Sequence, residues 1–250
     1  MNRNKLFVMV IGILCLAGLL QAQDPVHLFQ SFQYDAPISG GIYGEAGLLY
    51  VNFNDADVTE TIIAARGGIP FGKKIELVAQ LAYVNITPEN FDAMNGLADI
   101  GIYGRYNFFN NNGTVISAGP FVTLPIGEEE VGQGNLNYGA FCAARHTLGC
   151  GVSITGNIGL EFYETWEWKN GDFEETYTNQ LLVGAGAIFP LSKKTHIVGE
   201  FFMKGDMDYS VLSAGVDQKL GPGHLRVGVG IGLDDGAPDL MVAGCYGMAI

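Results

Sequence analysis

Apolar and polar side chains alternate along the segment GLADIGIYGRYNFF, residues 96–109. The even-numbered positions are small, aliphatic or aromatic, whereas the odd-numbered positions include Asp99, Tyr103 and Arg105. Successive side chains of a β-strand point to opposite faces of the sheet, so this period of two predicts a strand with one apolar and one polar face. In a soluble sheet the polar face meets water; in a membrane barrel the apolar face meets lipid and the polar face lines the lumen.

The same alternation recurs along nearly the whole chain after residue 40 and predicts about twelve strands. They span 41–54, 58–69, 75–86, 96–108, 115–125, 136–144, 150–163, 176–189, 196–204, 209–220, 225–233 and 240–250. Lipid cannot satisfy an open sheet edge, so two-faced strands in a bilayer must close into a barrel. The predicted fold class is all-β, a single closed antiparallel transmembrane β-barrel of about 12 strands.

The connections between these strands fall into two classes. Short turns rich in Gly, Pro, Asn and Lys occupy 70–74, 109–114, 145–149, 190–195 and 221–224, whereas longer and mostly acidic loops occupy 87–95, 127–135 and 164–175. A soluble sandwich has no reason to sort its loops by length. Short periplasmic turns and longer extracellular loops are typical of outer-membrane barrels.

Residues 1–23 have the pattern of a secretory signal peptide. Arg3 and Lys5 form a basic start, Leu6 to Leu20 form an apolar stretch too short for an anchor, and small or polar residues follow. We therefore expect export and localisation in the cell outer membrane, with the barrel formed by 41–250. The intervening segment 24–40, with Phe29, Phe32 and Tyr34, is expected to be either a periplasmic N-terminal segment or a small lumen plug.

The charge balance restricts the partners. The chain has 26 acidic against 13 basic residues, which disfavours nucleic acid because phosphate binding needs clustered Lys and Arg. The expected partners are outer-membrane lipid, the barrel-assembly machinery and a small solute of unknown identity. No cofactor is expected.

Polar residues on the inward face of the predicted strands are the candidate lumen-lining residues. They are Glu45, Glu60, Arg66, Glu76, Asp99, Tyr103, Arg105, Glu161, Glu200, Asp217, Lys219 and Arg226. Two roles remain open for them. They either form a selectivity lining, or they pair with one another and fill a narrow lumen, as in small barrels without an open channel.

Catalytic and metal-binding patterns are weak. His146, His196 and His224 lie in or near predicted short turns, His27 precedes the first strand, and no G-x-S-x-G motif occurs. We expect no catalytic residue and no enzyme activity. The run 128–130 consists of three glutamates without the ligand spacing of a calcium loop, so an acidic solvated loop is expected and no metal site.

Cys142 and Cys150 flank the predicted turn RHTLG and have the same parity. A hairpin centred on His146 would place them opposite each other, within disulfide reach, in a compartment that permits oxidation. A bridge between them is one possibility. The other is that they are unpaired, since Cys245 stands alone and cysteine also serves as a small apolar residue facing lipid.

Two further patterns point to outer-membrane barrels. The last strand places Leu240, Val242, Tyr246 and Met248 on one face before the terminal Ile250, which resembles the assembly signal of such barrels. The run 96–109, the stretch TVISAGPFVTLPIG and the following GQGN resemble the outer-membrane transporter family linked to the phenol-degradation MetA pathway. Ala98 and Ile126 depart from that family's pattern. The resemblance covers roughly 60–220 and implies a small barrel with a transport role.

The expected function is passive transport or uptake of small solutes, including apolar or aromatic ones. Two alternatives remain: a non-transporting barrel whose outer loops bind a partner or surface, and a soluble exported binder similar to lipocalins.

Overall fold

The structure is a computed structural model that describes residues 26–54, 56–128, 130–132, 134–169 and 172–249. The expected signal peptide, residues 1–23, lies outside these residues. No helix within the described part of the chain is long and apolar enough to cross a membrane.

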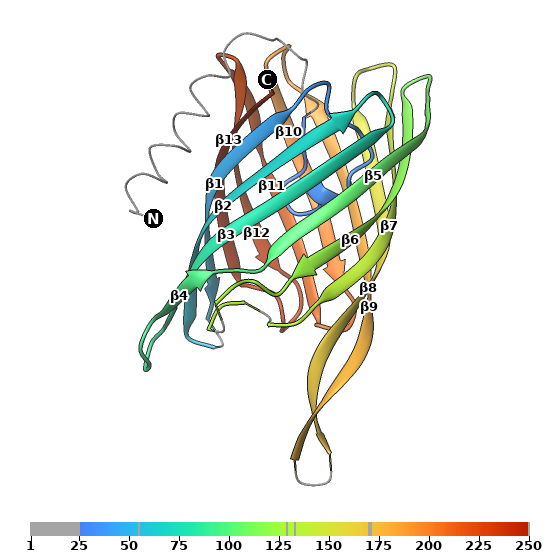
Figure 1. The fold of residues 1–250 in the computed structure, drawn as a ribbon. Helices are drawn as coiled ribbons and strands as arrows, with labels where there is room; N and C mark the ends of the chain where they lie inside the picture. The colour runs from blue at the N-terminus through green and yellow to red at the C-terminus, as the bar shows by residue number, and fades with distance from the viewer. Residues whose placement is uncertain (1–25, 55, 129, 133, 170–171, 250) are drawn as a thin grey trace, which may run out of the picture.

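The described chain forms one 3₁₀ turn and a single antiparallel sheet that closes on itself (Figure 1). Its elements are η1 (Phe32–Tyr34), β1 (Tyr43–Phe53), β2 (Val58–Phe71), β3 (Ile75–Pro88), β4 (Met94–Leu97), β5 (Ile100–Asn111), β6 (Thr114–Leu124), β7 (Asn137–Thr147), β8 (Ser153–Lys169), β9 (Asp172–Pro190), β10 (Thr195–Lys204), β11 (Tyr209–Leu220), β12 (Gly223–Gly232) and β13 (Leu240–Ala249). Consecutive strands pair with each other, except that β4 and β5 both pair with β3, and β1 pairs with β13, which closes the barrel.

Twelve strand positions make up the wall, because β4 and β5 share one of them. β4 pairs with the end of β3 from Tyr83 to Ile86, and β5 pairs with its beginning from Ile75 to Gln80. Ala98 and Asp99 lie between the two ladders. The predicted all-β barrel is confirmed, and the segment that the sequence predicts as one strand over 96–108 is interrupted at these two residues.

The two ends of the barrel differ in the way predicted. At the turn end, the strands are joined by short connections such as Asn112–Gly113, where φ values of 49° and 76° suit a tight two-residue hairpin turn. At the loop end, the connections are longer, and the β8–β9 hairpin projects far beyond the rest of the barrel (Figure 1). Residues 164–175, predicted as a loop, therefore mostly continue as paired strands, from Glu164↔Tyr177 to Lys169↔Asp172.

The outer surface of the barrel is apolar. Ile63, Ile158 and Val229 are each more than half exposed, and many large aliphatic and aromatic side chains share this outward face. Monomeric soluble proteins rarely expose a continuous apolar surface of this extent. Together with the closed wall, this surface disfavours the soluble lipocalin-like alternative and suits contact with lipid.

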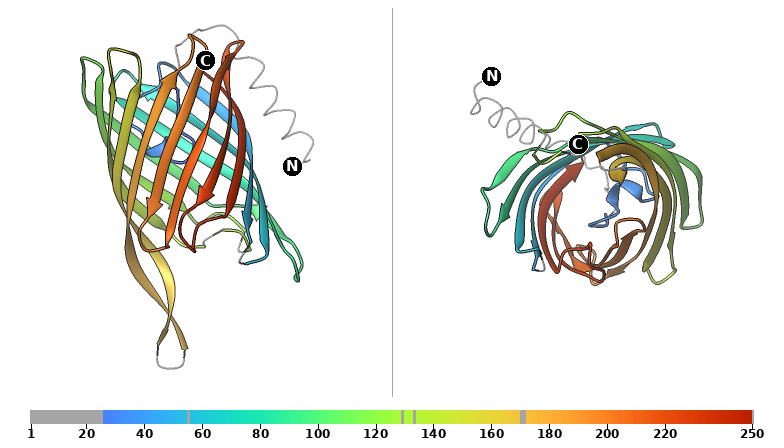
Figure 2. Two further views of the ribbon diagram at one scale, coloured as in Figure 1. Left: turned by 180° about the vertical axis from the view of Figure 1, so that it is seen from behind. Right: turned by 90° about the horizontal axis from the view of Figure 1, so that it is seen from below.

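The segment that precedes β1 lies inside the barrel, as the view along its axis shows (Figure 2). Leu28, Phe32 and Ala36 are fully buried. Tyr43, at the start of β1, packs its ring 5.6 Å from that of Phe32. Gly68 on β2 makes room for Tyr43, because a β-carbon at Gly68 would lie 2.1 Å from the tyrosine ring. The described residues 26–40 thus lie within the lumen.

Cys142 and Cys150, for which the sequence leaves both a bridge and unpaired thiols open, lie apart in the structure. β7 continues to Thr147, so the hairpin is centred near Cys150 and not near His146. Cys142 consequently faces Ile158 of β8, Cys150 lies in the turn, and both are free and exposed. The sequence interpretation ended this strand three residues too early, at 144, because His146 and Thr147 resemble turn residues.

Lysine at an outward position should disrupt the barrel far more than lysine at an inward one. We predict that Ile158→Lys destabilises the barrel by ~2–4 kcal/mol in a bilayer, because its outward side chain would place a charge in hydrocarbon. Gln180→Lys on the neighbouring strand should be tolerated, because this inward side chain already donates to Glu161. Folding in lipid vesicles, followed by heat-modifiable gel mobility, measures both. Equal tolerance would show that the assigned faces are wrong.

Candidate functional site

The lumen is occupied by the N-terminal segment 26–42, called the inner segment below, and polar contacts tie it to several strands of the wall. The first involves Glu200 on β10. Its carboxylate accepts hydrogen bonds from the backbone N–H groups of Phe29, Gln30 and Ser31, at 2.9, 2.9 and 2.6 Å. The Ser31 hydroxyl adds a bond of 2.5 Å. Glu200 thus satisfies three consecutive backbone donors that would otherwise be buried without a partner.

The second contact joins the inner segment to β3 and β5. Arg105 and Glu76 face each other in the ladder and form an ion pair of 2.7 Å. Arg105 also donates to the carbonyls of Pro37 and Phe32, at 2.5 and 3.1 Å, while Glu76 accepts the N–H of Ser39 at 3.0 Å. Both side chains are almost fully buried. The two charges therefore neutralise each other, and the remaining donors of Arg105 and the second carboxylate oxygen of Glu76 bind the backbone of the inner segment.

The third contact joins it to β7 and β8. Arg145 forms an ion pair with Asp35 of the inner segment and donates to the carbonyl of Val26 at 2.9 Å. The hydroxyl of Thr155 donates to Asp35 at 3.1 Å. Removing one member of a buried ion pair leaves an uncompensated charge, which typically costs ~3–5 kcal/mol. Loss of either charge would therefore destabilise the packing of the inner segment against β7 and β8.

An aromatic cluster closes one side of the lumen. The Tyr34 ring lies 5.4–6.0 Å from the rings of Tyr103, Phe121, Phe141 and Phe202, which come from β5, β6, β7 and β10. Burial, with smaller contributions from Tyr103 and Glu161, raises the pKa of the Tyr34 phenol well above its usual value. Tyr34 is therefore neutral, and its ring packs against this side of the wall as an apolar filler.

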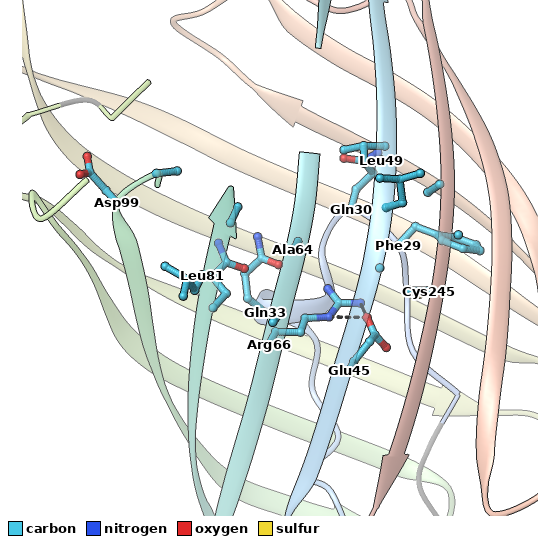
Figure 3. A pocket seen from close by; sticks show the side chains of 18 residues that line it. Phe29, Gln30, Gln33, Glu45, Leu49, Ala64, Arg66, Leu81, Asp99 and Cys245 are labelled. Carbon is cyan, nitrogen blue, oxygen red and sulfur yellow. Dashed lines mark hydrogen bonds and ion pairs between the residues drawn. The ribbon is translucent and has the colours of Figure 1, made fainter. Parts of the chain in front are cut away.

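A cavity of about 330 Å³ remains on the other side, between the inner segment and β13, β1, β2 and β3 (Figure 3). Phe29, Gln30 and Gln33 of the inner segment form one wall. Small residues of the barrel form much of the other wall, and they create the space: Gly47, Ala64, Ala82, Ala98, Ala243 and Gly244. Cys245, Arg66 and Glu45 complete the boundary near the turn end, and Asp99 lies at the far edge.

The charges beside this cavity are paired. Arg66 contacts Glu45 at 2.5 Å, and its guanidinium lies 3.7 Å from the ring centroid of Phe32. Arg226 contacts the same Glu45 and lies 3.8 Å from Asp217. His224 is 2.7 Å and His196 is 4.0 Å from Asp217. These groups form one network across β1, β2, β10, β11 and β12.

Asp99 has a local role at the interruption between β4 and β5. Its carboxylate accepts the backbone N–H of Gly127 at 2.9 Å. The N–H of Glu128 donates to the carbonyl of Leu97 at 2.8 Å. The Asp99 carboxylate and the Leu97 carbonyl at this interruption therefore hold the start of the loop that follows β6.

The predicted lumen-lining residues divide by position. Glu76, Arg105 and Glu200 hold the inner segment, Glu45, Arg66 and Asp99 border the cavity, and Tyr103 joins the aromatic cluster. Glu161 accepts a hydrogen bond of 2.7 Å from Gln180, while Asp217 and Arg226 belong to the network beside Glu45. Glu60 is inward and half-buried on β2. Lys219 is exposed at the end of β11, so it does not line the enclosed lumen.

The sequence interpretation missed Arg145 and Asp35. Arg145 lies on the same face of β7 as the inward Phe141 and Ala143. The sequence interpretation ended this strand at residue 144, so it did not assign Arg145 to the inward face. Asp35 lies in a segment without regular periodicity, so no pattern marked it.

The described residues contain no group of three or more His, Cys, Asp and Glu side chains that could hold a metal ion. His27 packs against the Phe32 ring at 4.5 Å, and His146 contacts the Thr114 hydroxyl at 2.7 Å. The histidines thus have packing or hydrogen-bonding partners from the barrel and the inner segment.

Replacing Glu200 should loosen the inner segment and leave the barrel folded. Glu200→Leu removes the acceptor of three backbone N–H groups, and each hydrogen bond to a charged group contributes ~1.5–3 kcal/mol. We predict that amide hydrogen exchange at Phe29, Gln30 and Ser31 accelerates at least ~10-fold.

Glu60→Leu is the matched control, because no hydrogen bond between described residues joins Glu60 to the inner segment. Hydrogen exchange with mass spectrometry on detergent-solubilised protein measures both variants. Unchanged exchange in Glu200→Leu, or equal acceleration in the control, would contradict the assigned role of Glu200.

Solved structures with a similar fold are outer-membrane channels. The structure of the COG4313 outer membrane channel from Pseudomonas putida F1 matches with a TM-score of 0.68 at 11% identity, over 90% of this chain and 100% of that chain. The KdgM porin matches with a TM-score of 0.55 at 11% identity, over 83% and 99% of the two chains. The NanC porin matches with a TM-score of 0.51 at 7% identity, over 84% and 98%.

Sequence comparison adds nothing to this fold-level likeness. No description of a known protein family matches the chain, and no curated protein matches it. At identities this low, the similarity establishes that this chain has the fold of outer-membrane barrel channels.

Proposed function

We propose that this protein is an outer-membrane channel for the passive passage of small solutes, which cross through the space between the inner segment and β13–β1–β2–β3. The observation that carries the proposal is the cavity of about 330 Å³ on that side. On the opposite side, the rings around Tyr34 fill the lumen. Passage therefore does not require the inner segment to leave the barrel.

The dimensions and lining of the cavity bear on the kind of solute. Ligand pockets for small molecules have volumes of ~300–1,000 Å³ and are mostly apolar with a few polar groups. Here Phe29, Leu49 and several alanines supply apolar surface, while Gln30, Gln33 and Gln80 supply amide groups. A small solute with an apolar body and one or two hydrogen-bonding groups suits this lining.

The orientation belongs to the same proposal. The short turns would face the periplasm and the long loops the exterior, as in outer-membrane barrels. The inner segment then enters the lumen from the periplasmic side.

The projecting β8–β9 hairpin favours a second candidate function. A strand pair that continues this far beyond the barrel offers a surface for an extracellular partner, which fits a non-transporting barrel. Its presence does not compete with transport, because it lies outside the lumen.

Filling the cavity should reduce transport. Ala82 faces the lumen on β3 and borders the cavity, and we predict that Ala82→Trp lowers single-channel conductance in planar bilayers by roughly twofold or more, since an indole fills much of the space. Ala79→Trp is the matched control, because Ala79 lies on the same strand and faces outward.

Conductance that is equal in both variants would place the route elsewhere. A wild-type protein that inserts without any conductance or solute flux would favour the partner-binding alternative.

A further inference from the structure

The barrel wall of the cavity changes in character from the turn end toward the loop end. Opposite residues of neighbouring antiparallel strands share one face of the sheet, so the ladders group the inward side chains into rows. The row nearest the turn end, called the polar row below, consists of Glu45, Arg66 and Gln80. The next row lies two residues along each strand, or ~7 Å away, and contains small side chains: Cys245, Gly47, Ala64 and Ala82. The third row is apolar: Ala243, Leu49, Ile62 and Val84.

Arg66 has donor capacity left at the edge of the cavity. Its Nε and Nη2 contact one carboxylate oxygen of Glu45, at 2.7 and 2.5 Å, and its guanidinium lies 3.7 Å from the ring centroid of Phe32 (Figure 3). None of the hydrogen bonds and ion pairs found between described residues involves its Nη1. The Arg66 side chain lines the cavity and is 15% exposed. Because a guanidinium only donates, the group that it can bind here is an acceptor oxygen.

Two amides line the cavity together with Arg66. Gln80 lies opposite Arg66 in the β2–β3 ladder, and its Nε2 donates to the Tyr103 hydroxyl at 3.0 Å. That bond uses one N–H of the amide, so the second N–H and Oε1 remain for other partners. Gln33 reaches the cavity from the inner segment. Hydrogen-bonding groups are therefore present on both walls.

Toward the loop end, the cavity is closed by apolar side chains. Val51 and Met241 face each other one row beyond Leu49 and are 3% and 5% exposed, so side chains fill the lumen there. Gln30 reaches this end, where its Nε2 donates to the weakly accepting sulfur of Met241 at 3.4 Å. Glu60, opposite Val51 on β2, is half-buried and is not one of the described residues that line the cavity. A hydrogen-bonding group of a bound solute therefore finds its partners mainly at the polar row.

The charges at the polar row are balanced. Arg66 and Arg226 contact Glu45, and Asp217 lies 3.8 Å from Arg226, in the network that also includes two histidines. Two arginines thus meet two carboxylates. A solute with a carboxylate would lose its hydration here without meeting an uncompensated positive charge. The carbonyl or hydroxyl oxygen of a neutral solute loses far less when it is desolvated.

We propose that the cavity is a binding site for uncharged amphipathic solutes. Arg66 and Gln80, with Gln33 on the opposite wall, bind an oxygen of the solute, and its apolar body lies over the row of small residues. This inference rests on the proposed channel function and specifies the solute class, its orientation and the residues that determine specificity. A single ring with a short polar substituent fits within about 330 Å³.

Acetophenone and α-methylstyrene test the preference, because they have nearly the same shape and differ in the carbonyl oxygen. Calorimetric titration of the protein in lipid nanodiscs, with empty nanodiscs as the blank, measures their binding. We expect acetophenone to bind at least ~10-fold more tightly, a difference of ~1.4 kcal/mol, because the hydrocarbon leaves buried polar groups without a partner. The infrared carbonyl stretch of bound, isotope-labelled acetophenone should shift to lower frequency than in hydrocarbon. Benzoate should bind more weakly than acetophenone.

Variants of the cavity assign the preference to named residues. Gln33→Leu/Gln80→Leu removes both amides and should lose most of the preference for acetophenone. Arg66→Met should also move the carbonyl stretch back toward its value in hydrocarbon. Gln180→Leu is the matched control, because Gln180 is an inward amide on β9 that donates to Glu161 outside the cavity, and it should keep the preference. Heat-modifiable gel mobility shows which variants are folded; if Arg66→Met does not fold, the amide variant decides.

The outcomes separate this inference from the channel function. Equal affinity for acetophenone and α-methylstyrene, or tighter binding of benzoate, in a protein that conducts would overturn the solute class and leave the channel function intact. An unchanged preference in the folded amide variant, or an equal loss in Gln180→Leu, would overturn the role of the polar row. A folded barrel that binds acetophenone with the expected preference but neither conducts nor passes solutes would overturn the channel function and support the binding site.

Discussion

Closure of the sheet is the constraint on which the rest of this structure depends. An unpaired strand edge in hydrocarbon leaves N–H and C=O groups without partners, so the first and last strands must meet, as β1 and β13 do through ten residue pairs. Closure also fixes what the two faces of every strand contact. The outward face must be apolar, and the inward face must line a lumen that here holds side chains, one short segment of backbone and the cavity beside it.

The inner segment resolves a problem that closure creates. Inward charges such as Arg105, Arg145 and Glu200 are buried in the described structure, and a buried charge is costly unless its hydrogen-bonding groups are satisfied. The backbone of the inner segment supplies N–H groups to Glu200 and carbonyls to Arg105 and Arg145. In return, a segment without regular strand pairing has its polar backbone groups satisfied. Wall and inner segment are therefore complementary, and neither set of polar groups could be buried at low cost without the other.

Much of the fold could be predicted because the physics behind it is periodic. Alternation with a period of two predicts eleven of the twelve strand positions, most of them within a few residues, and the remaining one is interrupted only at Ala98 and Asp99. The errors fall where local sequence signals are ambiguous. His146 and Thr147 read as turn residues but continue β7, and the polar run after Glu164 reads as a loop but pairs with β9. Cross-strand pairing overrides local propensity at both places.

The candidate site was less predictable for a different reason. Parity assigns Glu76, Arg105 and Glu200 to the lumen, but it gives no information on what they contact there. Their partners are backbone groups of a segment more than thirty residues away in sequence, brought near only by the closed barrel. The position of the cavity likewise follows from a difference between opposite walls, aromatic rings around Tyr34 on one side and small residues such as Ala64 and Ala82 on the other. The ion pairs Arg105–Glu76 and Arg145–Asp35 hold the inner segment against its side of the wall, so the space that remains lies where the opposite wall carries small residues.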